Sequence, residues 1–229
     1  MIASVILAAG ASERMGQPKA LLPIGGVPAI EVVLDTLRRA EAAPIVVVLG
    51  RHTAETIAGA DLGEAEIVEH AGWAAGRTSS IQAGIAAVPP ASRGIILALV
   101  DMPYVRASTI QTLADTFRAL PGSEAVIPIY QDRRGHPILL SRRLFDKIAA
   151  LGPDEPLRNL LRDARAVEVP VTDPGVLIDL DTPEDVRRAT AGATGADAKP
   201  NARPVGSPAV KAAAKPPGAT KLKAKPRRK

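Results

Sequence analysis

The chain begins with the stretch that decides its fold, residues 1–23, which read MIASVILAAGASERMGQPKALLP. The aliphatic run Val5–Leu7 predicts a buried strand. Small residues follow at positions 8–12, so successive backbone amides are free to face an anion. Arg14 and Lys19 then add two positive charges. The stretch therefore predicts a strand, an amide-rich loop and two cations gathered around a phosphate-rich ligand.

The loop also has a simpler interpretation, as an ordinary strand-to-helix turn with both cations in solvent. We favour the anion site because small residues, the two cations, Gly16 and the pair Pro18-Lys19 occur so close together. The loop matches neither the P-loop pattern nor the dinucleotide-binding pattern of glycines.

The composition predicts an α/β fold. The chain has 229 residues, of which 46% are hydrophobic and only 2% aromatic, so its core must be aliphatic. Such a core suits a mostly parallel sheet with helices on both faces. With no cysteine there is no disulfide or thiolate metal site, and the three histidines do not have the spacing of metal ligands.

The sequence contains no sign of a membrane or export segment. No apolar stretch approaches the length of a membrane-spanning helix, and residues 1–4 lack the positive charge that starts a signal peptide. We therefore expect a cytoplasmic location and no membrane partner.

The net charge of +5 conceals two unlike parts. From Lys199 onward the chain has seven Lys, three Arg and no acid, so residues 1–198 have 19 basic and 24 acidic residues and a net charge of −5. From Ala191 hydrophobic periodicity is lost, which predicts a domain over 1–190 and a disordered basic tail over 191–229. The tail is either a solvated extension or a contact for nucleic acid or an acidic partner.

Strands and helices alternate along residues 1–190, which predicts right-handed crossovers and a three-layer fold with a mostly parallel sheet. The predicted pair 125–129 and 136–140 forms a hairpin at the substrate end of the site. The remaining predicted elements are strands at 5–7, 44–50, 65–68, 95–100, 167–171 and 176–179, and helices at 28–39, 53–60, 79–85, 108–120, 142–151 and 157–162.

Asp101 follows the most hydrophobic predicted strand, 95–100, and Pro103 prevents that strand from continuing. Ligands of open α/β sheets bind at the carboxyl ends of the strands, so we interpret Asp101 as a metal or ligand carboxylate. The alternative, an N-cap of the helix at 108–120, is weakened by the intervening residues.

Asp179 and Asp181 stand at the end of the predicted strand 176–179, and alternation places them on one face of that end. Either can join Asp101 around a cation. The alternative for Asp181 is to brace the helix that begins at Pro183, for which Thr182 is a natural N-cap.

Two further groups are candidates with open alternatives. Ser79 and Ser80 stand at a predicted helix start, where their hydroxyls either cap the helix or bind a ribose, base or phosphate. Gly135 allows a backbone to approach a ligand closely, and the adjacent His136 is either structural or functional.

Six motifs taken in order resemble the MobA-like nucleotidyltransferases over about residues 3–190, and within that family the branch that joins CMP to the phosphate of molybdopterin. The first motif is highly specific for NTP-dependent nucleotidyltransferases, and the others gain weight from their order. They are LAAGASERMGQPKALLP at 7–23, GRTSSIQAGI at 76–85, LVDMP at 99–103, RRGHPILL at 133–140, EPLRNLL at 155–161 and DLDTPED at 179–185.

The resemblance implies a Rossmann-like nucleotidyltransferase fold, a Mg²⁺ cofactor and a role for each matched residue. Catalytic residues would be Arg14, Lys19 and Asp101, and metal ligands would be Asp101 with Asp179 or Asp181. Gly135 and His136 would bind the acceptor. Nucleotide-binding residues would be Leu7, Ala8, Ala9, Gly10, Gly16, Lys19, Gly76, Ser79 and Ser80.

The resemblance also implies substrates and partners. LAAG, where the guanylyltransferase branch has LAGG, and GHP at 135–137 indicate CTP as the nucleotide and molybdopterin as the acceptor. A molybdoenzyme or its maturation factor would receive the product. Two alternatives remain: a related transferase that uses GTP or another phosphate monoester, and a nucleotide- or nucleic-acid-binding regulator that acts through the basic tail.

Overall fold

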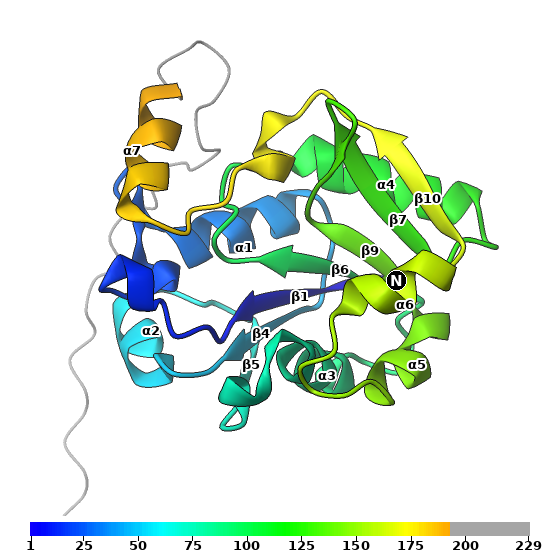
Figure 1. The fold of residues 1–229 in the computed structure, drawn as a ribbon, viewed down its shortest axis with the longest axis horizontal. Helices are drawn as coiled ribbons and strands as arrows, with labels where there is room; N and C mark the ends of the chain where they lie inside the picture. The colour runs from blue at the N-terminus through cyan, green and yellow to red at the C-terminus, as the bar shows by residue number, and fades with distance from the viewer. Residues whose placement is uncertain (193–229) are drawn as a thin grey trace, which may run out of the picture.

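Strand β1 (Ile2–Ala8) lies inside the sheet of the computed structural model, which describes residues 1–192 (Figure 1). It is buried almost along its length because its residues are aliphatic or small and both neighbours, β4 (Ile45–Leu49) and β6 (Gly94–Leu99), run parallel to it. The sheet order is β10-β7-β9-β6-β1-β4-β5, with β8 paired to β7. The other bounds are β5 Glu66–Glu69, β7 Ala125–Tyr130, β8 Arg133–Arg134, β9 Ile138–Ser141 and β10 Ala166–Pro170, and β2 Pro23–Ile24 pairs with β3 Val27–Pro28.

Helices cover both faces of the sheet, so the predicted three-layer α/β fold is confirmed (Figure 1). The sheet is mostly parallel, and β9 runs antiparallel between β6 and β7. Helices α1 and α4 pack together on one side, while α3, α5 and α6 form the other layer. The bounds are α1 Ala29–Arg39, α2 Thr53–Gly59, α3 Arg77–Ala87, α4 Ala107–Ala119, α5 Phe145–Ala149, α6 Leu157–Asp163 and α7 Pro183–Gly192.

Helix α3 lies close to the centre of the sheet because Gly84 has no side chain. A Cβ atom there would lie 3.0 Å from Cγ2 of Val48 and would overlap Val5. This close packing holds α3 against β1 and β4.

Two predicted elements differ from the structure. The strand expected at 176–179 is absent, and residues Pro174–Leu177 form a 3-10 helix instead. The reason is local: Asp173 accepts a hydrogen bond from Gly175 N at 2.9 Å, and Gly175 lies too close to the backbone of Tyr104 for any side chain. The single helix expected at 142–151 is a 3-10 turn, Arg142–Leu144, followed by α5.

The predicted boundary at 190 falls within α7, which continues to Gly192. The rest of the tail, 193–229, lies outside the described residues, and its predicted disorder stays a prediction. Among the helices of residues 1–192, none is long and apolar enough to cross a membrane.

Candidate active site

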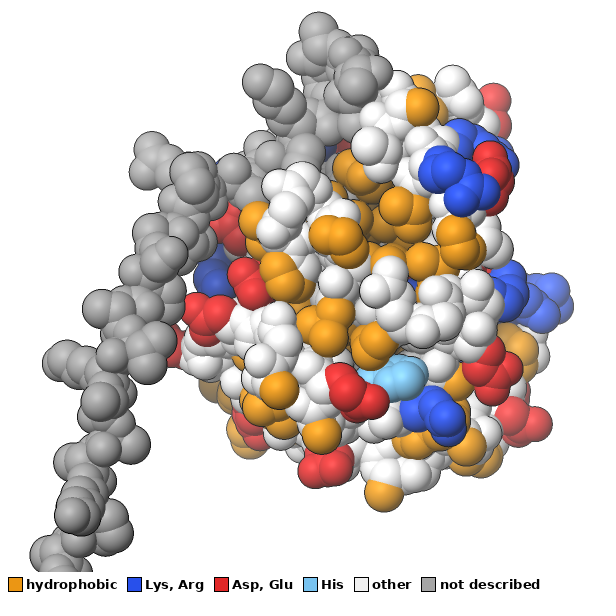
Figure 2. Space-filling model, turned by 90° about the vertical axis from the view of Figure 1, so that its left-hand side faces the viewer, with side chains coloured by type: hydrophobic (Ala, Val, Ile, Leu, Met, Phe, Trp, Pro, Cys, Tyr) orange, Lys and Arg blue, Asp and Glu red, His pale blue; other side chains and the backbone are white. Residues whose placement is uncertain are grey.

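A cavity of about 570 Å³ opens at the carboxyl ends of β1 and β6. This is the edge of the sheet to which the strands point in Figure 1, and Figure 2 views the molecule from that side. Uncharged side chains occupy much of the middle of this face, with acidic and basic side chains around them. The predicted residues that line the cavity are Leu7, Ala8, Ala9, Gly10, Arg14, Lys19, Gly76, Ser80, Asp101 and Asp181.

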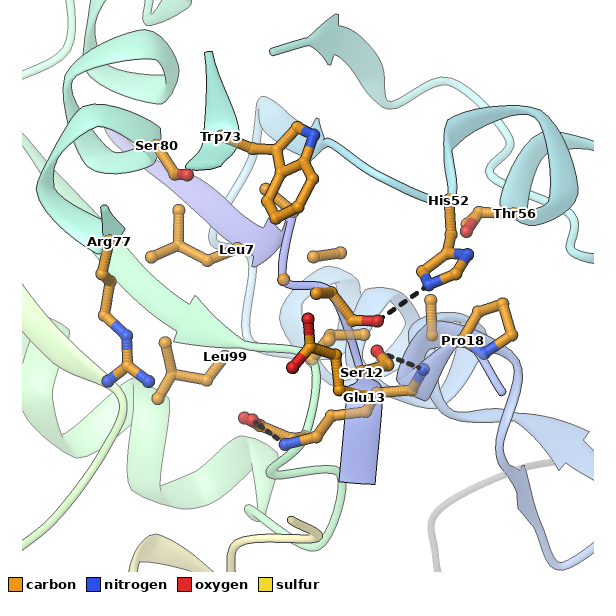
Figure 3. A pocket seen from close by; sticks show the side chains of 18 of the residues that line it. Leu7, Ser12, Glu13, Pro18, His52, Thr56, Trp73, Arg77, Ser80 and Leu99 are labelled. Atoms are coloured by element: carbon orange, nitrogen blue, oxygen red, sulfur yellow. Dashed lines mark hydrogen bonds and ion pairs between the residues drawn. The ribbon is translucent and has the colours of Figure 1, made fainter. Parts of the chain in front are cut away.

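The loop after β1 is held in shape by two left-handed backbone turns and by hydrogen bonds of Ser12 and His52. Ser12 has a φ of 54° and Gly16 a φ of 67°, so the chain turns sharply on both sides of the short 3-10 helix Glu13–Met15. The Ser12 hydroxyl accepts a hydrogen bond from Lys19 N at 3.1 Å, and His52 Nε2 lies 3.0 Å from Ala11 O (Figure 3). These contacts hold the loop against the cavity.

Lys19 and Arg14 point at carboxylates that come from distant parts of the chain. Lys19 Nζ donates to Asp101 Oδ2 at 2.9 Å and also to Asp181, while Arg14 donates to Asp181 Oδ2 at 2.6 Å. Burial alone would lower the pKa of Lys19, but the charge of Asp101 and hydrogen bonds to both carboxylates outweigh it and raise that pKa. The hydrogen bond from Lys19 lowers the pKa of Asp181. Both predicted cations therefore share one cluster with the acidic residues.

Asp101, Asp179 and Asp181 form a group suited to a divalent cation. Each can offer one carboxylate oxygen, and these oxygens all lie within 4.8 Å of one another. Asp101 Oδ1 is buried and has no hydrogen-bond partner within residues 1–192, which leaves one oxygen free for a ligand. Oxygen donors of this kind fit Mg²⁺ or Mn²⁺ rather than zinc.

The segment that carries two of these carboxylates is anchored on both sides of the cavity. Leu180 N donates to Asp101 O at 2.9 Å, and the Leu180 side chain is fully buried with Met15 and Leu22. Burial, followed by the charges of Asp101 and Asp181, raises the pKa of Asp179 to about 6. Three carboxylates thus converge without the strand that the sequence predicted.

The helix-capping alternatives do not apply to Asp101 or Asp181. The buried Asp173 accepts from Arg106 N at 2.8 Å and from the Thr109 hydroxyl at 2.7 Å, at the start of α4. At the start of α7, Thr182 Oγ1 accepts from Asp185 N at 3.2 Å.

Three predicted nucleotide or metal residues are not among those that line the cavity: Gly16, Ser79 and Asp179. The Ser79 hydroxyl donates to Gly76 O at 2.7 Å and lies 2.9 Å from His70 Nε2, so it is used inside the protein, but it does not cap α3, which has no side-chain cap. Gly76 has a φ of 130°, and a Cβ atom there would lie 2.7 Å from Pro153 O. Glycine at this position lets the segment around Pro153 close against α3.

The predicted acceptor residues also lie outside the cavity lining. Gly135 packs against Val176, and His136 N donates to Val176 O at 2.9 Å. His136 is largely buried and its Nδ1 has no hydrogen-bond partner among the described residues. Burial, followed by the charge of Arg77, lowers the pKa of His136 to about 4, so its imidazole is neutral.

Trp73, Arg77, His52 and Thr56 line the cavity but were not predicted as site residues. Figure 3 shows Trp73 above the cavity, with Arg77 and Ser80 on one side and His52 and Thr56 on the other. A signal existed for two of them: Trp73 is the chain's single tryptophan, and Arg77 lies inside the motif GRTSSIQAGI.

The chain is similar to known proteins in sequence and in fold. A family model described as the MobA-like NTP transferase domain matches residues 4–169. Nicotine blue oxidoreductase from Paenarthrobacter nicotinovorans is 34% identical over 154 residues, which cover 65% of this chain and 75% of that protein. The bifunctional protein GlmU from Leifsonia xyli is 39% identical over 132 residues, or 55% of this chain, and the chain spans only 26% of its length.

One solved structure with the same fold is a complex with manganese. The Rv0371c complex with manganese from Mycobacterium tuberculosis superposes with a TM-score of 0.69 at 30% identity, covering 82% of this chain and 96% of that one.

Proposed function

Because the chain belongs to the family of MobA-like NTP transferase domains, we propose that it is a Mg²⁺-dependent cytidylyltransferase that transfers CMP from CTP to the phosphate of molybdopterin. The observation that carries the proposal is the cluster of Lys19 and Arg14 with three carboxylates at the edge of one cavity. That arrangement brings together the charges that transfer of a nucleotide between two anions requires.

In this reaction a phosphate monoester oxygen attacks the α-phosphorus of CTP. A new P–O bond forms, the bond between the α-phosphorus and the bridging oxygen breaks, and pyrophosphate leaves with the electron pair. Lys19 and Arg14 offset the negative charge that grows on the leaving group. Asp101, Asp179 and Asp181 would hold Mg²⁺, which would polarise the α-phosphate when bound.

The choice of CTP rests on the residues shared with the cytidylyltransferase branch, Ala9 in LAAG and the GHP motif at 135–137. Ala9 is buried and lines the cavity, as a residue near the base would. Gly76 and Ser80 line the same cavity and complete the proposed nucleotide site.

The test is release of pyrophosphate with molybdopterin, Mg²⁺ and each nucleoside triphosphate in turn. We expect release with CTP, a cytidylated product of matching mass and little release with the other nucleotides. Release with GTP alone would assign the chain to guanylyl transfer. Release with another phosphate monoester but not with molybdopterin would keep the chemistry and change the acceptor.

Two other functions, a redox reaction and nucleic-acid binding, can be distinguished from cytidylyl transfer by direct assays. Nicotine blue oxidoreductase suggests a redox reaction, which would show as consumption of NADH or NADPH by the purified protein in the presence of a dye acceptor. The carboxylate cluster favours nucleotidyl transfer, because hydride transfer does not require three acidic residues around a cation.

A regulator acting through the basic tail would lose salt-sensitive nucleic-acid binding when residues 193–229 are deleted, whereas the cytidylyltransferase would keep its turnover.

A further inference from the structure

The cavity is lined by a third cation, Arg77, in addition to Arg14 and Lys19 of the loop after β1. Arg77 is the first residue of α3, and its side chain lines the cavity. Figure 3 shows it opposite His52, Thr56 and Pro18, with its guanidinium group beside Leu99. Leu99 ends β6, two residues before Asp101. Arg77 thus lies across the cavity from Pro18 of the loop after β1, and its charge partly offsets the rise that burial causes in the pKa of Asp179.

Arg77 also differs from the loop cations in its contacts. Lys19 and Arg14 are both paired with carboxylates. Within residues 1–192, no hydrogen bond or ion pair is found for the Arg77 side chain. It is the one unpaired Lys or Arg among the described residues that line the cavity. Its five N–H donors are therefore available to a ligand, and a guanidinium group matches a phosphate in a bidentate manner.

The in-line geometry of the proposed reaction distinguishes the side of the cavity where the acceptor enters from the side where pyrophosphate leaves. The attacking oxygen and the leaving oxygen lie roughly in line on opposite sides of the α-phosphorus. Lys19 and Arg14 belong to the loop that would hold the triphosphate, so pyrophosphate leaves towards them. The acceptor must then enter from the side of Arg77.

We propose that Arg77 binds the phosphate group of the acceptor and so marks the acceptor side of the cavity. This inference rests on the proposed function, because it assumes a phosphate monoester as the second substrate. Such an acceptor is an anion and must approach three carboxylates, which is unfavourable without a positive charge beside it. His136 is neutral, so it does not supply that charge.

Arg77→Met and Arg77→Lys test the inference, with Arg118→Met as a matched control. Arg118 lies on α4, is exposed and pairs with Asp115 outside the cavity. CTP affinity can be followed by the fluorescence of Trp73, the only tryptophan, since it lines the cavity. We expect Arg77→Met to raise the KM for the acceptor by about 10- to 100-fold, as for a lost charged hydrogen bond. Its Kd for CTP should stay within about twofold of wild type, and Arg77→Lys should be intermediate.

A second measurement does not depend on molybdopterin. Inorganic phosphate is titrated calorimetrically into the protein saturated with Mg²⁺ and an α,β-methylene analogue of CTP. We expect binding to the wild type and to Arg118→Met, and a loss of about 10-fold or more in affinity for Arg77→Met.

The outcomes separate this inference from the proposed function. A parallel loss of CTP affinity in Arg77→Met would overturn the inference by assigning Arg77 to the triphosphate. Unchanged KM for the acceptor and unchanged phosphate affinity would overturn it as well. If the wild type fails to cytidylate molybdopterin yet binds phosphate through Arg77, the named acceptor is wrong and the phosphate site stands.

Discussion

Replacing Lys19 with Met removes the ammonium group that lies between Asp101 and Asp181. The side chains of Lys19 and Asp101 are only 15% and 14% exposed, so their pair is largely shielded from water. Removing one partner of a buried pair costs about 3–5 kcal/mol. We expect about 2–3 kcal/mol here, because Asp181 is 34% exposed and keeps Arg14 at 2.6 Å. For a domain of this size, that lowers the Tm by about 4–12 °C without metal or nucleotide.

The same substitution has opposite effects on metal binding and on turnover. Three carboxylates remain without the competing ammonium group, so Mg²⁺ should bind Lys19→Met more tightly and raise its Tm by more than it raises that of the wild type. Turnover should nevertheless fall by about 10²- to 10³-fold, because the charge that offsets the leaving pyrophosphate is gone.

The assay is a thermal melt with EDTA and with Mg²⁺, followed by pyrophosphate release on the same preparations. Lys147→Met is the control: Lys147 pairs with Glu124 at 3.4 Å, is 56% exposed and lies outside the cavity. Its stability should change by less than about 1 kcal/mol and its turnover should not change. If Lys19→Met keeps near-normal turnover, or if Mg²⁺ raises its Tm by less than in the wild type, the assignment of Lys19 to this cluster is refuted.

Two other predictions concern the pH dependence of the site and the packing of the core. The pKa of Asp179 is about 6 in the folded protein and about 3.9 when unfolded, so its ionisation destabilises the fold increasingly as pH rises from about 4 to 6. Asp179→Asn should therefore raise the Tm in EDTA by about 2–4 °C at pH 7.5 but not at pH 4.5, and equal shifts at both pH values would contradict the cause given. Gly84→Ala should cost about 1–3 kcal/mol in chemical denaturation, because its Cβ would overlap Val5, whereas Gly122→Ala, with no atom within 4 Å of its Cβ, should stay within about 1 kcal/mol of wild type.

The parts of the fold that follow from local patterns were predictable from sequence. Strands β1, β4 and β6 are continuous aliphatic runs, and such runs are buried in a parallel sheet whatever their neighbours are. Asp101 could be placed in the site for the same reason, since it directly follows one of these runs. The role of the two loop cations, Arg14 and Lys19, could also be predicted, because the small residues before them leave backbone amides free to face an anion.

The parts that depend on distant contacts were not predictable. The apolar run at Val176–Ile178 has the pattern of a strand, but the segment is held by Asp173 and by the close approach of Gly175 to Tyr104, and neither contact appears in a local pattern. The Ser79 hydroxyl is used inside the protein because His70 reaches it from the preceding loop.

The cations and carboxylates of the cavity neutralise one another in the structure, and this has a consequence for binding. Three acidic side chains this close would repel one another if Lys19 and Arg14 pointed away. A triphosphate that arrives with Mg²⁺ supplies both new partners at once: the metal takes the carboxylates, and the phosphates take the cations. A triphosphate alone must instead compete with the carboxylates for both cations. CTP should therefore bind much more tightly with Mg²⁺ than in EDTA, and Asp101→Asn should reduce that difference without weakening CTP binding in EDTA.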